Sequence, residues 1–199
     1  MVIPMRRLRE PTLATLFSGL ATALFSATLY ADTNVNFTAS VQKDTCQIKI
    51  DGNGTVNFAT IAPAYFADGI TAETDYEGGG KEFTIKLISC PISDGKITNV
   101  TFNFAPLNGQ FSPENQQVFP NDIATDAGGV DNVGVVIFTT DSPRTNVLNT
   151  DGSSRATFAA STYSDTVWTF YSRMQKIRSA EKVTTGELSS RVLVNVSYE

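Results

Sequence analysis

Apolar and polar residues alternate with a period of two along most of the chain after residue 31. Phe83, Ile85 and Leu87, for example, are separated by Thr84 and Lys86. A period of two places successive side chains on opposite faces, as in a strand with one buried face. Alternating or β-rich runs of this kind predict strands in five segments: 83–88, 100–105, 133–138, 167–171 and 192–198.

Clusters of Gly, Asp, Asn and Ser separate these runs and predict turns. They lie at residues 51–54, 77–80, 93–95, 126–129 and 151–154. After residue 31, no segment has a sustained helical period with capping residues, and no internal repeat is present. Many short strands joined by turns predict an all-β fold, an antiparallel sandwich of immunoglobulin type.

Residues 34–50, before the first of these segments, also alternate, but the phase of the alternation changes part-way along. The early apolar residues have odd numbers: Val35, Phe37, Ala39 and Val41. The later ones have even numbers: Cys46, Ile48 and Ile50. A one-residue change of phase turns every side chain to the other face, so we expect a break at residues 42–45. The first stretch either returns to its own domain as a separate strand or projects away from it, and the pattern leaves both possibilities open.

The C-terminal end is also a strand by its pattern. Five apolar residues share one parity there: Leu188, Val192, Val194, Val196 and Tyr198. Because chain ends generally fray, a strand that runs to the last residues needs a partner strand or a cover. We therefore expect another segment to pair with residues 192–198.

Residues 1–31 resemble a secretory signal. Three arginines in the first ten residues precede an apolar stretch, Leu13–Leu29, and the cleavage-like triplet Leu29-Tyr30-Ala31. A transmembrane helix is the alternative, but 17 residues interrupted by Ser, Thr and Gly are short for a span. Removing 31 of the 199 residues leaves 168, which predicts one domain.

Composition and charge exclude several classes of function. The chain has no histidine, which excludes an imidazole base and a zinc site built on His. Residues 1–31 hold three of the 15 basic and one of the 20 acidic residues, so 12 and 19 remain, a net charge of −7. A chain this acidic is a poor partner for nucleic acid or an anionic membrane surface.

The two cysteines, Cys46 and Cys90, are the only ones in the chain. In the oxidising compartment that a signal implies, they predict one disulfide. It closes a loop of 45 residues, counted from 46 through 90, which contributes about 4 kcal/mol in the chain-entropy treatment. A catalytic Cys-x-x-Cys pair is absent.

Other motifs have simpler explanations than catalysis. Gly78-Gly79-Gly80-Lys81 has Glu82 where a phosphate loop needs Ser or Thr. The Asp and Asn residues at 51–53 and 126–131 could hold calcium, but turn chemistry explains them. The single tryptophan, Trp168, stands among β-branched and aromatic residues and is predicted to lie in the core. No enzyme, metal site or cofactor site is predicted.

The two ends and the cysteine pair together resemble the single-domain pilin subunits of the chaperone–usher pathway, above all the minor subunits of type 1-like fimbriae. The resemblance rests on Val35-x-Phe37-x-Ala39-x-Val41 before Cys46, and on Phe83-x-Ile85-x-Leu87-x-Ser89-Cys90-Pro91. It also rests on Gly186, fourteenth from the end, and on Tyr198, next to last. The chain departs from the family at Ala39, where a glycine is usual.

This resemblance implies an incomplete immunoglobulin-like sandwich that lacks its last strand. Residues 32–44 are then an N-terminal donor-strand extension, and residues 45–199 are the pilin domain. The extension fills the groove of a neighbouring subunit with Val35, Phe37, Ala39 and Val41. A periplasmic chaperone first recognises the C-terminal strand, and an outer-membrane usher assembles the fimbria at the bacterial surface, where it supports adhesion. The chaperone-recognition residues implied are Gly186, Val192, Val194, Val196 and Tyr198.

Three rival functions remain at this stage. An autonomous secreted sandwich could bind carbohydrate through its loops and Trp168. A tip adhesin resembles a two-domain chain, for which 168 residues are too few. A hydrolase with two facing carboxylates is compatible with 19 acidic residues, although no pair stands out.

Overall fold

The computed structural model describes residues 33–39, 47–66, 69–89, 98–159 and 167–198. These residues form nine strands and three single-turn 3-10 helices: β1 (Thr33–Ala39), β2 (Gln47–Ile50), η1 (Asp51–Gly54), β3 (Thr55–Phe58), η2 (Pro63–Tyr65), β4 (Lys81–Ser89), β5 (Asn99–Pro106), η3 (Thr125–Ala127), β6 (Val133–Thr139), β7 (Ala156–Ala159), β8 (Val167–Lys176) and β9 (Ser189–Tyr198). None of the helices among these residues is long and apolar enough to cross a membrane.

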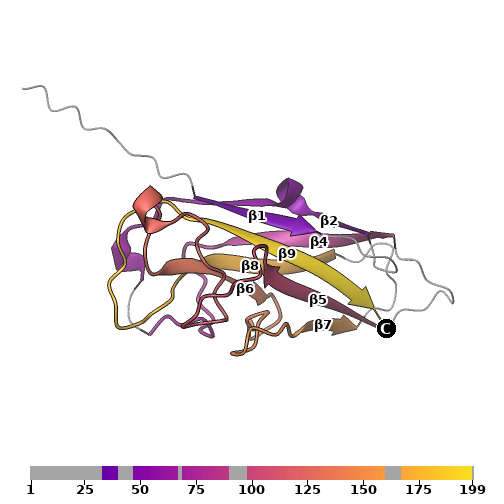
Figure 1. The fold of residues 1–199 in the computed structure, drawn as a ribbon. Helices are drawn as coiled ribbons and strands as arrows, with labels where there is room; N and C mark the ends of the chain where they lie inside the picture. The colour runs from indigo at the N-terminus through magenta and orange to yellow at the C-terminus, as the bar shows by residue number, and fades with distance from the viewer. Residues whose placement is uncertain (1–32, 40–46, 67–68, 90–97, 160–166, 199) are drawn as a thin grey trace, which may run out of the picture.

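The strands form two sheets that face each other (Figure 1). One sheet has the order β3-β1-β9-β5-β7 and the other β2-β4-β8-β6. Every neighbouring pair is antiparallel except β1 and β9, which run parallel. The predicted all-β sandwich is therefore confirmed, as are strands in all five predicted segments. The two four-residue strands β3 and β7 were not predicted, because runs this short carry little alternation.

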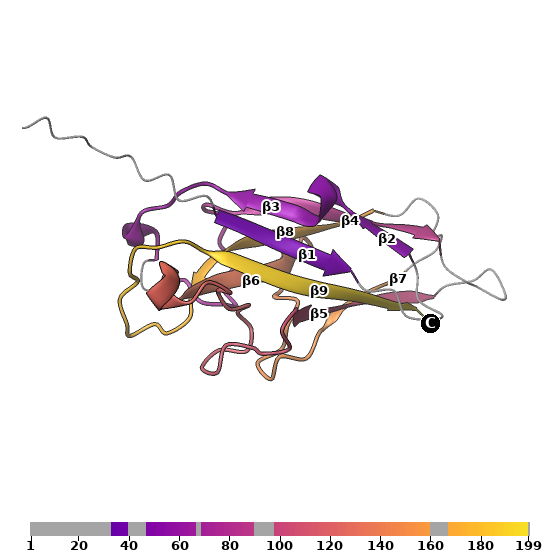
Figure 2. The same cartoon turned by 45° about the horizontal axis from the view of Figure 1, so that its top comes forward.

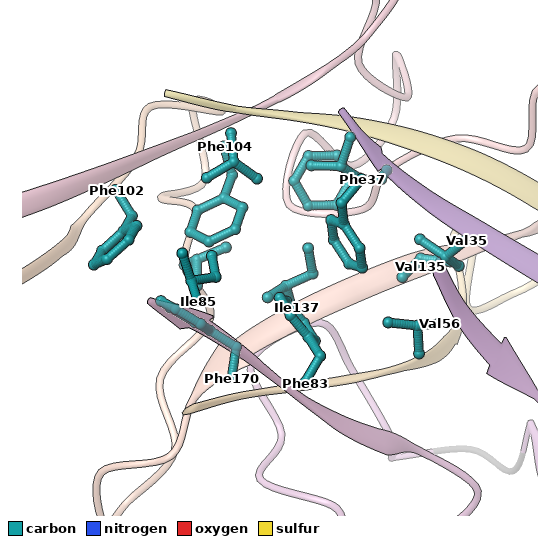
Figure 3. Close-up of a cluster of buried hydrophobic side chains, with 14 of the residues drawn as sticks. Val35, Phe37, Val56, Phe83, Ile85, Phe102, Phe104, Val135, Ile137 and Phe170 are labelled. Carbon is teal, nitrogen blue, oxygen red and sulfur yellow. The ribbon is translucent and has the colours of Figure 1, made fainter. Parts of the chain in front are cut away.

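The core lies between the two sheets and is rich in phenylalanine (Figure 3). Phe102 and Phe104 of β5 meet Phe170 of β8 edge to face, with ring centroids 5.4 and 5.2 Å apart. Trp168 is 7% exposed and packs on Phe102 at 5.2 Å, so its predicted place in the core is confirmed. Edge-to-face geometry between sheets fills space densely and adds to the gain from burial.

The outer face of the four-stranded sheet is also covered where β6 and part of β8 lie, contrary to a simple alternation. Every residue of β6 is buried, including Val136 and Phe138, which point away from the main core. A second apolar cluster forms there with Ala72, Val118 and Tyr171. Residues 69–80 and 111–119 therefore act as a cover over a face that alternation assigns to solvent.

The phase change near the N-terminus corresponds to a change of sheet. β1 belongs to the five-stranded sheet and β2 to the four-stranded sheet, so no single strand serves both stretches. The expected break at residues 42–45 lies outside the described residues. Of the two possibilities left open by the pattern, this structure has the first stretch within its own domain, and it lies between two strands rather than at an edge.

Candidate functional site

The place of β1 in the sheet is the feature that any function must explain. β1 pairs with β3 over four residue pairs, Thr33↔Phe58 to Asn36↔Thr55. On its other side it pairs with β9 over six, Asn34↔Ser189 to Ala39↔Val194. In the described sheet, only β1 joins β3 to β9 (Figure 2). We call the space that it fills between them the slot.

Two side chains of β1 fill the slot from the core side. Val35 is completely buried and lies in register with Val56 of β3. Phe37 is 7% exposed, and its ring stacks on Phe83 of the opposite sheet with centroids 4.4 Å apart (Figure 3). Without these two side chains, the slot would open onto the main core.

The turn η1, which precedes β3, packs against β1 at Gly54. Gly54 ends η1 with a φ of +78°, a conformation that L side chains rarely adopt. A methyl group on its Cα would lie 2.6 Å from the carbonyl oxygen of Phe37. The sequence marks residues 51–54 as a turn, but it contains no sign that this turn touches β1. Both the turn and the closeness of the strand require glycine here.

The C-terminal strand β9 forms the other wall of the slot. Val192 and Val194 are completely buried and lie in register with Phe37 and Ala39, and Val196 is 3% exposed. On its far side β9 pairs with β5 as far as Val100↔Tyr198. The expectation that another segment pairs with residues 192–198 is therefore met by β5 along the whole stretch and by β1 as far as Val194.

Gly186 precedes β9 and is held by a crossing loop. A methyl group on its Cα would lie 2.5 Å from the backbone nitrogen of Val130 and 2.7 Å from the carbonyl carbon of Gly129. The neighbouring Glu187 accepts a hydrogen bond from the Val130 N–H at 2.9 Å and donates one to the Gly128 carbonyl at 3.0 Å. The loop packs so closely that only glycine fits at position 186.

An apolar cavity continues the slot beyond the start of β1. It has a volume of about 620 Å³ and lies between the chain that follows β3 and the chain that precedes β9. Its apolar lining comes from Ile61, Phe66, Val130, Met174, Val183 and Leu188. The cavity thus lies at the end of the slot where β1 begins, and the sequence pattern did not predict it.

Burial shifts the pKa of three groups, Tyr65, Tyr171 and Arg173, which interact with one another. Burial raises the pKa of Tyr65 to about 12 and also raises the pKa of Tyr171. Burial lowers the pKa of Arg173, whose guanidinium donates to the carbonyl oxygens of Thr71 at 2.8 Å and Thr74 at 3.0 Å. This cluster holds the cover on the sheet, whereas the wall residues of the slot named above, Val56, Val192 and Val194, are apolar.

Three of the predicted site residues cannot be placed here: Val41, Cys46 and Cys90 lie outside the described residues. Ala39 is described by its backbone, which pairs with Val194. Of the residues singled out in the sequence, the structure brings Val35, Phe37, Val192 and Val194 together in the slot.

A comparison with known families decides the class of protein. A sequence model of the family described as "Fimbrial protein" matches residues 35–199. The chain belongs to this fimbrial family. The match includes β1 and β9, the strand inside the slot and one of its walls.

One curated relative agrees with this assignment. The fimbrial chain is 38% identical over 175 residues to an uncharacterized fimbrial-like protein, YadK, of Escherichia coli strain K12, covering 85% of this chain and 86% of that protein. Among solved structures it is similar to the CupB6 tip adhesin of Pseudomonas aeruginosa, with a TM-score of 0.41 and 9% identity. That match covers 80% of this chain, and the chain spans only 43% of the adhesin.

Proposed function

We propose that this fimbrial protein is a structural, non-enzymatic subunit that polymerises by exchanging the strand in the slot. Residues 32–44 of one subunit leave their own slot and fill the slot of the next. The observation that carries this proposal is the place of β1 between β3 and β9. Because β1 alone joins β3 to β9 in the described sheet, its departure leaves a gap one strand wide that an equivalent strand can fill.

The energetics favour a filled slot over an empty one. Burying Val35 and Phe37 contributes about 1.5–3 kcal/mol each, and each ladder hydrogen bond adds about 1 kcal/mol. An empty slot exposes this apolar surface and two unpaired strand edges, which favours aggregation. The slot therefore needs a strand inside it at every stage of assembly. A second copy of the subunit can supply the same segment.

The direction in which a strand enters the slot favours a strand from a second copy over the chain's own β1. Within one chain, β1 runs parallel to β9 over six pairs and antiparallel to β3 over four. A strand from another chain can enter in the opposite direction, which makes the longer ladder antiparallel. Antiparallel pairing is slightly more stable per residue, so exchange between chains gains on the longer ladder. Because a strand has a period of two, Val35, Phe37, Ala39 and Val41 share one face in either direction.

The remaining parts of the proposal concern transport and partners. After export and removal of residues 1–31, a periplasmic chaperone shields the slot and recognises Gly186, Val192, Val194, Val196 and Tyr198. An outer-membrane usher then exchanges the chaperone for the next subunit, and the fimbria at the cell surface supports adhesion. An apolar cavity beside Gly186 supports this proposal, because it lies at the end of the slot that such a partner strand would enter.

A labelled peptide tests the exchange directly. We expect the full chain with Phe37→Ala to bind a fluorescent peptide of residues 32–44, because its own strand is held more weakly. Loss of the buried ring costs about 3–5 kcal/mol, which raises the open fraction roughly a hundredfold or more. Binding is followed by fluorescence anisotropy, with Val35→Ala as a milder second variant.

Two controls accompany this experiment. A chain with Asn57→Ala, an exposed position on β3, should bind no faster than the native chain. A peptide with Phe37→Asp should not bind any of the chains. If the folded Phe37→Ala and Val35→Ala chains ignore the native peptide, strand exchange is refuted. The rival carbohydrate-binding module has lost its one aromatic candidate, because Trp168 is buried.

A further inference from the structure

One polar side chain lies unpaired in the wall of the slot. Ser190 of β9 is 1% exposed, and its hydroxyl has no hydrogen-bond partner among the described residues. It stands between Leu188 and Val192, whose side chains are also buried. A buried hydroxyl without a partner is unfavourable, because it has lost its hydrogen bonds to water.

The strand that now fills the slot cannot supply this partner. Val35 is the residue in register with Ser190, and it is completely buried. On the other side of Val35 lies Val56 of β3, which is apolar too. The hydroxyl of Ser190 therefore faces methyl groups from the nearest residue of β1.

Elsewhere in the same sheet, facing polar residues of neighbouring strands do pair. The hydroxyl of Thr55 on β3 donates to the amide oxygen of Asn36, its partner on the outer face of β1, at 3.3 Å. The hydroxyls of Thr101 and Thr157, which are in register on β5 and β7, lie 2.9 Å apart. Side chains in register across these strands are thus within hydrogen-bond distance.

We propose that Ser190 selects the strand that occupies the slot. It favours a strand from another chain with Ser or Thr at the inward position beside it, over this chain's own Val35. This selection rests on the proposed strand exchange, and it assigns to Ser190 a part in the choice of neighbour. When the chain's own β1 fills the slot, the hydroxyl of Ser190 stays unpaired opposite Val35. A strand with a hydroxyl at that position gives it a hydrogen-bond partner.

A double-mutant cycle in the full chain tests the pairing without any exchange. Val35→Thr keeps the shape of valine and adds a hydroxyl beside Ser190. We expect its unfolding equilibrium constant to stay within threefold of the native value. The matched control is Val194→Thr, another buried valine of the slot whose registered neighbours are Ala39 and Phe104. It should raise the constant tenfold or more.

The Ser190→Ala background completes the cycle. Ser190→Ala alone should leave the constant unchanged or lower it, because it removes an unpaired hydroxyl. Adding Val35→Thr to Ser190→Ala should then raise the constant tenfold. Equal effects of Val35→Thr in both backgrounds overturn the pairing. A tenfold destabilisation by Ser190→Ala overturns it as well, since the hydroxyl then already has a partner.

Peptide competition tests the selection itself. Three variants of the 32–44 peptide carry Val35→Thr, Ala39→Ser or Val41→Thr, so that a hydroxyl reaches Ser190 whichever way the strand enters. We expect one of them to bind the Phe37→Ala chain at least fivefold more tightly than the native peptide, and to lose this advantage on Ser190→Ala. Equal binding of all peptides overturns selection alone, whereas no binding by any of them overturns strand exchange and selection together.

Discussion

The contact between Gly54 and β1 gives a sharp test of where the N-terminal strand lies. Replacing Gly54 by alanine places a methyl group 2.6 Å from the Phe37 carbonyl oxygen. Gly52, two residues earlier in the same turn, also has a positive φ, +59° against +78°, but has no atom within 4 Å of the corresponding position. Gly52→Ala is therefore the matched control, with the backbone strain and without the clash.

The magnitudes of the two substitutions follow from this difference. An L side chain in the left-handed region costs about 1–2 kcal/mol, which applies to both variants. Gly54→Ala must in addition push β1 outward. The upper limit of that second cost is the release of Val35 and Phe37 from the core, about 3–6 kcal/mol for the pair. We expect Gly54→Ala to be the more destabilising variant by about 2 kcal/mol or more.

Urea denaturation of both variants measures this difference, with the free energies of unfolding compared at equal slopes. The labelled 32–44 peptide supplies a second readout, because an expelled β1 leaves the slot open to it. If the two variants lie within about 0.5 kcal/mol of each other, the range of ordinary surface substitutions, β1 does not rest on this turn. In that case β1 does not lie against Gly54, and its place between β3 and β9 is wrong.

Three further predictions concern the ring in the slot, the crossing loop and the outer cover. Phe37→Ala lowers the free energy of unfolding by about 3–5 kcal/mol in urea denaturation, and a loss below about 1 kcal/mol would place the ring outside the core. Gly186→Ala lowers the melting temperature more than Gly109→Ala, which has open space around it, because the new methyl meets the Val130 backbone at 2.5 Å. Stability falls as the pH rises from 10 to 12, because the pKa of Tyr65 is about 12 when folded and 10.0 otherwise, so the unfolded chain loses that proton first. Tyr65→Phe should flatten that part of the pH profile, and an unchanged profile would contradict the burial of the phenol.

The cover over the four-stranded sheet marks a limit of pattern reading. Arg173 lies between Ser172 and Met174 in β8, and a charged residue at such a position is expected to face solvent. Its side chain is nevertheless completely buried. One terminal nitrogen of its guanidinium, Nη2, donates to carbonyl groups of Thr71 and Thr74, about a hundred residues earlier. Alternation reports which face a side chain shares with its neighbours in sequence, but it contains no information on what distant segment covers that face.

The cavity, Gly54 and Ser190 were missed for the same reason. A glycine in a turn and a serine in a strand are ordinary residues in sequence. Their importance comes from the nearness of Phe37 and Val35, which belong to a different strand. For Gly186 the sequence offered a family position, and the structure adds the physical reason, a backbone that crosses within contact distance of its Cα.

The sequence by itself determined the all-β class, seven of the nine described strands, the inward face of those that alternate and the change of phase after β1. Periodicity specifies these properties because each depends on residues one or two positions apart. Only the tertiary structure decided that β1 enters its own sheet between β3 and β9. The apolar side chain of Val35 would suit any slot of this shape. The residue in register with it, Ser190, lies 155 positions later, from 35 to 190. A local pattern defines what a strand buries, whereas the partner that it pairs with depends on the whole fold.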